Sequence, residues 1–339
     1  MSARSKVSDA IEQVHAAPDV FVVRVPFKNI STNATNCYVV RDGGEVLVVD
    51  TGAPTDEAAR VLLGALDELG VDRSCASWFL THFHLDHAGL VDRVVPDGAR
   101  LYVSAVECGE ARASHTAVCL ESLQRTFVRE GLSFSDASAY ARLGVEPSLF
   151  DTSRVKTTFV HEGEEIPVGG LRLRVVETPG HTPGHLSLFE PSSRILFGGD
   201  HVLFVISPSI ALFQRGVNGL TAYLDSLRKV RRLDAAQLFH SHGDIRPDFE
   251  DRIAWLERHH TERLDEVCRI VADAPGLSGY EALRSITWNV PHDTWEDISF
   301  LQRWCIVTEG IVYLDHVVGQ GRVMRSPDID GVYRYYPKA

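Results

Sequence analysis

The stretch THFHLDHAG, residues 81–89, places three histidines and one aspartate within six consecutive positions, directly after an apolar run that predicts a strand. Side chains two apart in an extended segment point to the same side, so His82 and His84 can face one point. Asp86 and His87 follow on the turn and can face a second point. Imidazole and carboxylate groups are ligands that zinc and iron accept. Since one ion needs three or four ligands, this stretch predicts two metal ions that take further ligands from elsewhere in the chain.

Three later segments end predicted strands with residues of the same kind: TPGHTPGH (178–185), FGGDHV (197–202) and FHSHGD (239–244). A single histidine in a loop is more often an ordinary hydrogen-bonding group than a ligand. Four segments that each deliver such groups at a strand end indicate a metal site instead. The additional candidate ligands are His181, Asp200, and either His240 or His242.

The bulk composition is that of a globular protein, and its acidic charge disfavours general nucleic-acid binding while leaving a local basic patch open. The chain has 339 residues, of which 44% are hydrophobic and 24% charged, with a formal net charge of -12. An acidic surface repels phosphate backbones. Six cysteines without a C-x-x-C pair favour free thiols in a reducing compartment. No apolar run has the length of a signal peptide or a membrane span, so we expect a soluble cytoplasmic protein.

The hydrophobic patterns predict two mixed strand-and-helix halves followed by a helical tail. Two βαβ-like halves with polar residues at the strand ends suggest two sheets packed face to face, with helices outside. We expect a catalytic domain at 1–248 that contains a helical lid insert at about 105–153, and a helical module at 249–339. Predicted strands lie at 20–26, 36–42, 45–52, 76–82, 101–104, 156–181, 185–200 and 235–244, predicted helices at 55–69, 105–130, 135–143 and 219–233, and a small β-wing at 321–337.

THFHLDHAG resembles the H-x-H-x-D-H signature of the metallo-β-lactamase superfamily. The similarity extends, in the order usual for that family, to VVDTG (48–52), TPGHTPGH, GGD and the late histidine. It implies an α/β fold: an αββα four-layer sandwich with a dinuclear site at one edge. RIAWLERHHTERLDEV (252–267), LSGYEALRSITW (277–288) and the closing wing resemble the winged-helix-like C-terminal module of a branch with an endoribonuclease-like member.

The resemblance also assigns the ligands. Those of the first ion are His82, His84 and His181; those of the second are Asp86, His87 and His242; the bridge between both ions is Asp200. An aspartate at the bridging position is typical of hydrolases resembling glyoxalase II and of lactonases and RNA-processing members, whereas the family's true β-lactamases have a cysteine there.

Five residues near these ligands have open roles. Asp86 is a candidate proton shuttle as well as a ligand, so Asp86 and Asp200 are the predicted catalytic residues. Asp50 is similar to an aspartate that orients a ligand histidine in this family. His185 either acts in the same way or is ordinary polar packing. His201 could contact substrate, and His240 either supports a ligand or simply ends a strand.

We therefore predict a hydrolase with two divalent metal ions, zinc first, with iron or manganese as alternatives. A hydroxide shared by the ions would attack a small acyl substrate, a thioester or an ester. The alternatives are a nuclease or phosphodiesterase, a lactonase, and a metal-bound interaction protein without turnover. The expected partner is the small acyl substrate, not nucleic acid or a membrane, and a homodimer is compatible with the sequence.

Overall fold

The computed structural model describes residues 7–27, 32–114, 116–143, 150–213, 217–290 and 293–338. The chain divides into two compact units. Unit 1 comprises Met1–Ala111, Pro147–Pro208 and Ser226–Ile253, and unit 2 comprises Arg112–Glu146, Ser209–Asp225 and Ala254–Ala339. Among the helices within the described ranges, none is both long and apolar enough to cross a bilayer.

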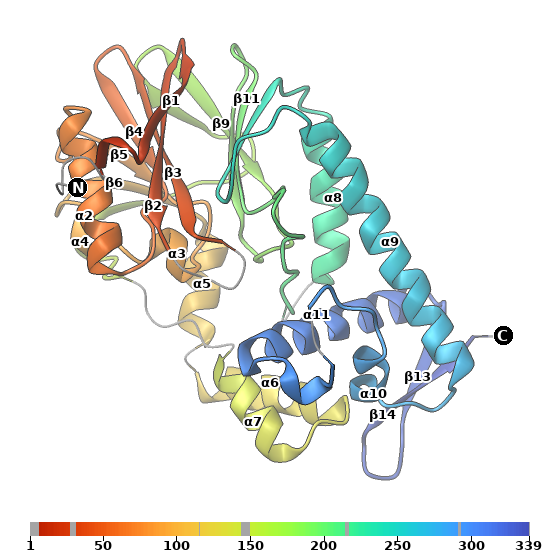
Figure 1. Cartoon of the computed structure of the whole chain (residues 1–339). Coiled ribbons are helices and arrows are strands. Elements are labelled where there is room, and N and C mark those ends of the chain that lie inside the picture. The colour runs from red at the N-terminus through yellow and green to blue at the C-terminus, as the bar shows by residue number, and fades with distance from the viewer. Residues whose placement is uncertain are drawn as a thin grey trace. The chain divides into compact units, whose positions relative to one another are not determined.

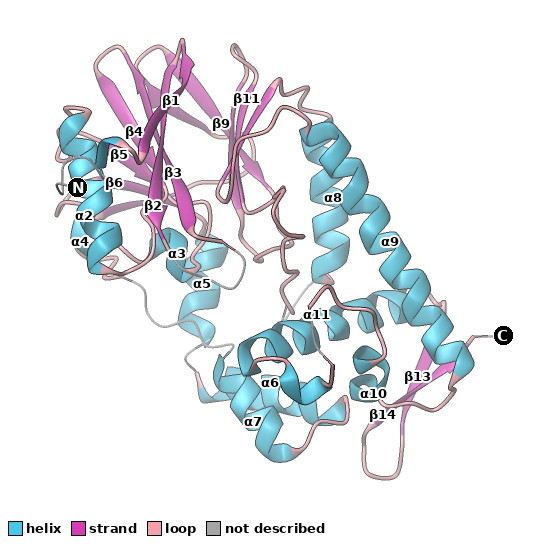
Figure 2. Ribbon diagram, viewed as in Figure 1, coloured by secondary structure: helices cyan, strands magenta, loops and turns pink. Residues whose placement is uncertain are grey.

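Unit 1 contains a first sheet whose strands follow one another in chain order (Figures 1 and 2). Its strands are β1 Ile11–Ala16, β2 Asp19–Pro26, β3 Ala34–Asp42, β4 Glu45–Val49, β5 Ser77–Phe79, β6 Arg100–Val103 and β7 Lys156–Phe159. The first four pair antiparallel and the remainder pair parallel. A hairpin turn joins β3 to β4, the predicted strands 36–42 and 45–52, through Gly43 and Gly44, whose φ angles of 55° and 87° favour glycine.

The second sheet of unit 1 has the order β12-β11-β10-β9-β8. Its strands are β8 Glu165–Val168, β9 Leu171–Glu177, β10 Leu186–Glu190, β11 Ile195–Gly199 and β12 Gln237–His240. Only the pair β11 and β12 is parallel among these five strands, and the crossover between them contains helix α8, Gly219–Arg231. The carboxyl ends of β11 and β12 therefore meet at one edge of this sheet.

The strands of the first sheet alternate between two buried faces. Val22, Tyr38 and Leu47 pack with Val175 and Phe197 of the second sheet in a core between the sheets. The intervening residues belong to a separate core that includes residues of α2 (Asp56–Glu68) and α4 (Val91–Val94). One face of the first sheet therefore meets the second sheet and the other face meets helices. This confirms the predicted order of layers for the half of the sandwich that contains the first sheet.

Helices close the two outer faces of unit 1. Helix α2 begins as predicted, because the Thr55 side chain accepts a hydrogen bond from the backbone N–H of Ala58. At the second sheet, Ser226 in α8 donates to the Pro179 carbonyl (2.9 Å) and Lys229 donates to the Glu177 carbonyl (2.7 Å). These contacts hold the end of α8 against the end of β9. The αββα fold class is thereby confirmed.

Unit 2 combines part of the predicted insert with the C-terminal segment. Its elements are α6 Ala117–Arg129, α7 Phe134–Leu143, α10 Gly279–Arg284, the short 3-10 helix η1 Trp295–Asp297, α11 Phe300–Gly319, and the hairpin of β13 Val323–Pro327 and β14 Tyr333–Pro337. Helix α5 (Ala105–Ser114), α8 and α9 (Phe249–Asp273) each run through the boundary between the units. The predicted β-wing is therefore present. The division into a catalytic domain with a lid and a separate tail stays a prediction.

A buried glutamate joins the insert to the C-terminal elements within unit 2. Glu130 follows α6, and its carboxylate accepts a hydrogen bond from the Tyr335 hydroxyl of β14 at 2.7 Å. Its carbonyl accepts from the backbone N–H of Tyr280 in α10 at 2.7 Å. Burial raises the pKa of the Glu130 carboxyl to about 7, against the opposing effect of the Tyr335 hydroxyl and Arg325.

The raised pKa of Glu130 contributes to the free energy of unfolding of unit 2, and this contribution is lost as the pH rises. Between about 4.5 and 7 the folded state keeps a proton on Glu130 that the unfolded state releases, so the free energy of unfolding falls across this window. The slope contributed by one group is at most about 1.4 kcal/mol per pH unit. Glu130→Gln should remove this slope and therefore flatten the pH dependence relative to the wild type.

Tryptophan fluorescence during urea unfolding measures this slope, because four of the five tryptophans lie in unit 2. The wild type and the variant are compared from pH 4.5 to 7.5, and only the difference in slope is judged. Identical slopes would show that Glu130 ionises normally in the folded protein.

Candidate metal centre

The predicted ligands follow the carboxyl ends of β5, β9, β11 and β12. Asp86 and His87 lie in the short helix α3, Leu85–Ala88, and the other ligands lie on loops. Two backbone hydrogen bonds connect the sheets at this edge. The N–H of Leu186 donates to the Thr81 carbonyl at 2.8 Å, and the N–H of Asn36 donates to the Ser241 carbonyl at 2.6 Å. These bonds bring together chain segments that are more than a hundred residues apart.

All seven predicted ligand side chains come together at this edge. The first candidate group is His82, His84 and His181, the second is Asp86, His87 and His242, and the third is His82, His87 and Asp200. Within each group the ligand atoms lie within 4.8 Å of one another. The first two groups reproduce the two ligand sets that the sequence predicts. Binding of metal by these residues remains a prediction.

Asp200 faces both ligand groups with different oxygen atoms. Its Oδ2 lies 3.5 Å from His181 Nε2, which belongs to the first group. Its Oδ1 lies 3.5 Å from His87 Nε2 and 3.3 Å from His242 Nε2, both of the second group. A carboxylate held in this way can place one oxygen on each of two cations.

Asp50 orients two of the histidines. His87 donates through Nδ1 to Asp50 Oδ2 at 2.9 Å, which leaves His87 Nε2 to face the ligand cluster. The Thr81 hydroxyl donates to the same carboxylate (2.9 Å) and accepts from His82 Nδ1 at 3.0 Å. Asp50 holds this position at a φ of 62°, fixed by its backbone bond to the Phe79 carbonyl (2.8 Å). The Asp50 prediction thus agrees with its contacts, which fix the tautomers of both rings.

His185 supports the backbone of Asp200. Its Nε2 accepts a hydrogen bond from the Asp200 N–H at 3.1 Å, while its Nδ1 pairs with the Thr178 hydroxyl at 2.8 Å. Burial lowers the pKa of His185 well below the usual range, and neighbouring histidines add to the effect, so the ring stays neutral and can accept. Gly199 is required beside it, because a Cβ there would lie 2.7 Å from His185 Nε2.

His240 and His242 have different surroundings, although they are only two residues apart. His242 lies in the second ligand group, and its Nδ1 donates to the Ala34 carbonyl at 2.9 Å. His240 ends β12 as a buried ring 5.2 Å from the Phe204 ring, and burial lowers its pKa to about 4. Of the two alternatives, the geometry selects His242 as the candidate ligand.

His201 and two strand residues complete the surroundings. His201 is 1% exposed and burial lowers its pKa to about 3, which argues against direct contact with substrate. Asn36 Nδ2 and the Tyr38 hydroxyl both donate to the His240 carbonyl, at 3.1 and 2.6 Å. The sequence analysis missed both residues, although polar side chains inside the buried run NCYVV were a usable signal.

The donor set fits metal cations. His82 Nε2, His87 Nε2 and Asp200 Oδ1 are buried, and each lacks a hydrogen-bond partner in the described structure. Such atoms are costly to bury unless a ligand or ion satisfies them. Burial lowers the pKa of His82 well below its usual range and thereby keeps it in the neutral form that binds metal. Burial also opposes a proton on His87, but Asp200, Asp86 and Asp50 together raise its pKa well above the usual range. The cluster therefore attracts positive charge.

Replacing Asp50 with asparagine should weaken metal binding by roughly 10- to 100-fold, because the variant loses the charged acceptor that fixes the His87 ring. Asparagine tolerates the positive φ, so backbone strain does not confuse the result. Competition with a chromophoric chelator measures the affinity. The matched control is Asp72→Asn, whose carboxylate also accepts from a backbone N–H and a hydroxyl, both of Ser74. Equal affinities in the two variants would contradict the role given to Asp50.

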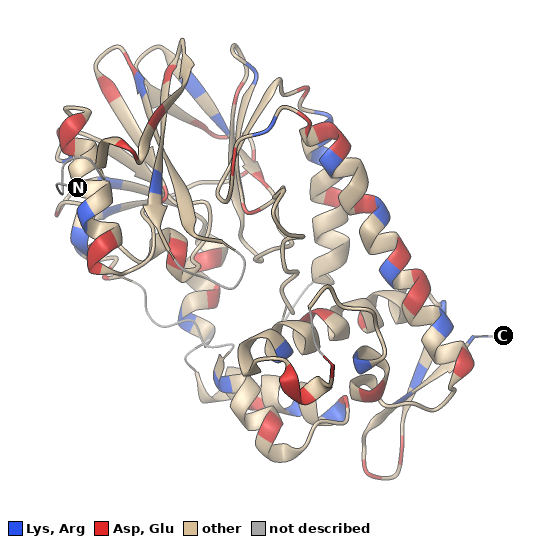
Figure 3. Cartoon of the chain, viewed as in Figure 1, with Lys and Arg blue, Asp and Glu red and all other residues tan. Residues whose placement is uncertain are grey.

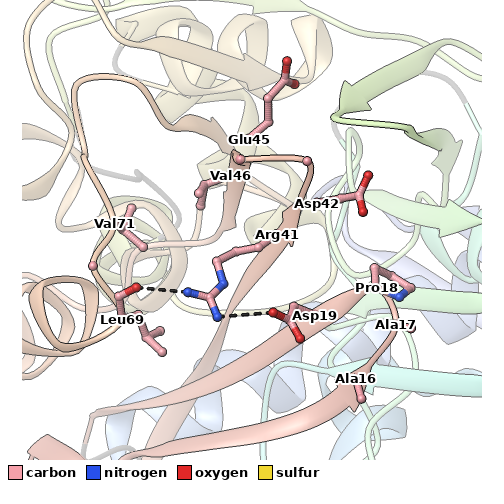
Figure 4. Close-up of a pocket in the computed structure, with 13 residues that line it drawn as sticks. Ala16, Ala17, Pro18, Asp19, Arg41, Asp42, Glu45, Val46, Leu69 and Val71 are labelled. Carbon is pink, nitrogen blue, oxygen red and sulfur yellow. Dashed lines mark hydrogen bonds and ion pairs between the residues drawn. The ribbon is translucent and has the colours of Figure 1, made fainter.

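A separate pocket of about 560 Å³ lies near the β1–β2 and β3–β4 turns (Figure 4). Arg41 crosses it and donates to the Leu69 carbonyl at 3.0 Å and to Asp19 Oδ2 at 3.3 Å. At its rim, Asp42 accepts from the Gly170 N–H at 2.7 Å. None of the candidate ligands lines this pocket, and its charged groups are engaged by the protein itself.

Comparisons with known proteins find similar sequences and a similar solved structure. The sequence model of the metallo-beta-lactamase superfamily matches residues 31–242. The chain is 29% identical to the "Probable metallo-hydrolase YqjP" of Bacillus subtilis over 76% of this chain and 82% of that protein. It is 26% identical to an "Atrochrysone carboxyl ACP thioesterase" of Emericella nidulans over 69% of this chain, and it spans 59% of that enzyme. A crystal structure of a metallo-beta-lactamase family protein from Thermus thermophilus superimposes with a TM-score of 0.74 at 26% identity, over 94% of this chain and 98% of that one.

Proposed function

Because the chain belongs to the metallo-beta-lactamase superfamily, we propose that it is a dinuclear metal-dependent hydrolase of a small acyl thioester or ester. The observation that supports two ions is the position of Asp200, whose two carboxylate oxygens face different histidine groups at 3.3 to 3.5 Å. A site for one ion would not need a carboxylate between two sets of donors. Zinc is the first candidate, with iron and manganese as alternatives.

Two divalent ions in this cage would supply Lewis acidity that activates a water molecule and polarises the scissile carbonyl. The protein's own part is to hold the donors and to move protons. Asp86 Oδ2 lies 3.4 Å from His242 Nε2 and belongs to the second ligand group, and the Asp86 side chain keeps 13% exposure. It can therefore take a proton from the attacking water and pass it to the leaving thiolate or alkoxide as the bond from carbonyl carbon to sulfur or oxygen breaks.

Acyl thioesters are proposed as substrates on the strength of relatives. The metallo-hydrolase and the thioesterase named above match 76% and 69% of this chain, respectively. Since the chain spans only 59% of the thioesterase, the substrate of that enzyme is not transferred as such. For this chain we propose the general chemistry of a thioesterase, which is attack on an activated acyl carbon. The aspartate at position 200, in place of a cysteine, favours this hydrolase branch over β-lactam hydrolysis.

The proposal is tested by turnover with metal-loaded protein on panels of acyl-CoA and acyl-glutathione thioesters, simple esters, γ-lactones and single-stranded RNA. Thioester or ester hydrolysis that disappears on chelation is the expected result. Cleavage of RNA alone would replace the proposal with the nuclease alternative, and opening of γ-lactones alone would replace it with the lactonase. Stoichiometric metal binding without turnover on any panel would favour an interaction protein.

The charge pattern disfavours the nuclease alternative. Basic and acidic residues are interspersed along α9 (Figure 3). In the basic run at the end of α8, Lys229 pairs with Glu162 at 2.7 Å and Arg231 with Glu250 at 3.6 Å. Cations that are already paired add little to phosphate binding. A cytoplasmic location and a small-molecule partner stay predictions.

A further inference from the structure

Glu107 is a buried carboxylate in the first turn of α5, with 5% exposure. Its Oε2 accepts a hydrogen bond from the backbone N–H of Phe83 at 3.0 Å. Its Oε1 accepts from the backbone N–H of Gly184 at 2.8 Å. One side chain therefore joins two loops that are about a hundred residues apart in the sequence.

Both loops carry ligands of the same candidate group. Phe83 stands between His82 and His84, and Gly184 stands three residues after His181. These three histidines form the first ligand group. The two hydrogen bonds that the Glu107 carboxylate accepts therefore fix the spacing of the two segments that must supply all three donors.

The position of Glu107 is itself fixed by its surroundings. The Ser104 hydroxyl accepts from the N–H of Val106 (3.1 Å) and of Glu107 (3.4 Å), as at the beginning of a helix. The loop approaches so closely that a Cβ on Gly184 would lie 2.6 Å from Ser104 Oγ and 2.7 Å from the Glu107 backbone nitrogen. Only glycine fits there without displacing α5 or the loop.

We infer that Glu107 is a positioning residue specific to the first metal ion: it sets the geometry of the two loops that carry His82, His84 and His181. This inference rests on the proposed dinuclear function. It also predicts that the second ion is bound nearly normally without Glu107. Asp86 and His87 lie beyond Phe83 in α3, where Asp50 holds His87, and the Ala34 carbonyl holds His242.

The test measures metal affinity, not turnover, in Glu107→Gln. Glutamine keeps the shape but replaces one oxygen with an NH₂ group, which cannot accept from a backbone N–H. We expect the affinity for one of the two ions to fall about tenfold or more, and the other to stay within about threefold. Zinc is titrated against a chromophoric chelator, and the absorption spectrum of bound Co²⁺ reports the geometry of each site.

Two backgrounds identify the affected ion. His242→Ala damages the second group and leaves the first, and there Glu107→Gln should weaken the remaining ion. His84→Ala leaves the second group, and there Glu107→Gln should have no effect. Equal weakening in both backgrounds, or weakening in neither, would overturn the inference. A wild-type protein that binds no ion would instead refute the proposed function.

Two further variants keep the test decisive. Glu190→Gln is the matched control, because Glu190 is also buried in unit 1 and accepts from the N–H groups of Ser192 (3.1 Å) and Ser193 (2.6 Å), in a turn without ligands. It should leave both affinities unchanged. Gly184→Ala keeps the carboxylate but pushes the loop away, so it should weaken the first ion even where Glu107→Gln fails to fold. Normal affinity for the first ion in Gly184→Ala would contradict the inference.

Discussion

Asp200→Asn should reduce kcat/KM for the thioester or ester substrate by roughly 10³-fold or more, because the amide cannot give a negatively charged oxygen to each of two cations. The geometry predicts a simultaneous loss of bound metal. Asp200 Oδ2 faces His181 of the first group, while Oδ1 faces His87 and His242 of the second. The measurement is kcat/KM on the best thioester of the panel, together with metal content per chain.

Asp234→Asn serves as the matched control for this substitution. Asp234 is also an aspartate of unit 1, but its side chain is 84% exposed and pairs with Arg194 at the surface. Its replacement should leave kcat/KM and metal content within about twofold, as for most surface substitutions. Full metal content and near-normal kcat/KM in Asp200→Asn would remove the bridging role from the proposed mechanism.

Removal of the metal ions should destabilise unit 1 strongly. The empty cage leaves His82 Nε2, His87 Nε2 and Asp200 Oδ1 buried without hydrogen-bond partners. One ion at a free concentration about a thousand times its Kd contributes about 4 kcal/mol to stability. For a unit of this size that corresponds to a fall in Tm of roughly 8 to 16 °C on chelation.

Differential scanning calorimetry with and without a chelator checks this expectation, and re-addition of Zn²⁺, Fe²⁺ or Mn²⁺ separately shows which ion restores both Tm and turnover. A transition assigned to unit 2 should move little, because the candidate ligands all lie in unit 1. An unchanged Tm for unit 1 with complete removal of metal would show that the cage is stable when empty.

The layered fold was predictable because its signals are local. The β3–β4 hairpin follows from Asp42-Gly43-Gly44, and α2 follows from Thr55 and an apolar pattern of helical period. Strand β1 was missed because its sequence, IEQVHA, has no clear alternation and its side chains are half-buried or exposed. An edge strand that buries little carries little pattern.

The candidate ligands were predictable for a different reason. Metal ligands need specific residue types, so THFHLDHAG and TPGHTPGH stand out even without a structure. The supporting residues do not stand out in this way. Glu107 lies in an alanine- and glutamate-rich helix and meets Gly184, 77 positions away, only after folding. No spacing rule within a single sequence predicts such a contact, because the tertiary structure alone creates it.

The parallel pairing of β11 with β12 also governs when the cage can exist during synthesis on the ribosome. His82 and His242 are 160 positions apart, and the donor from β12 is the last to be translated. When only THFHLDHAG has left the ribosome, the nascent chain offers four donors at once. The later ligands His181, Asp200 and His242, which would confer geometry and selectivity, are still missing. If the proposed metal site forms, correct metallation must wait until the crossover through α8 is complete. A polypeptide interrupted before Ser241 would then hold its histidines as a loose, unselective chelator.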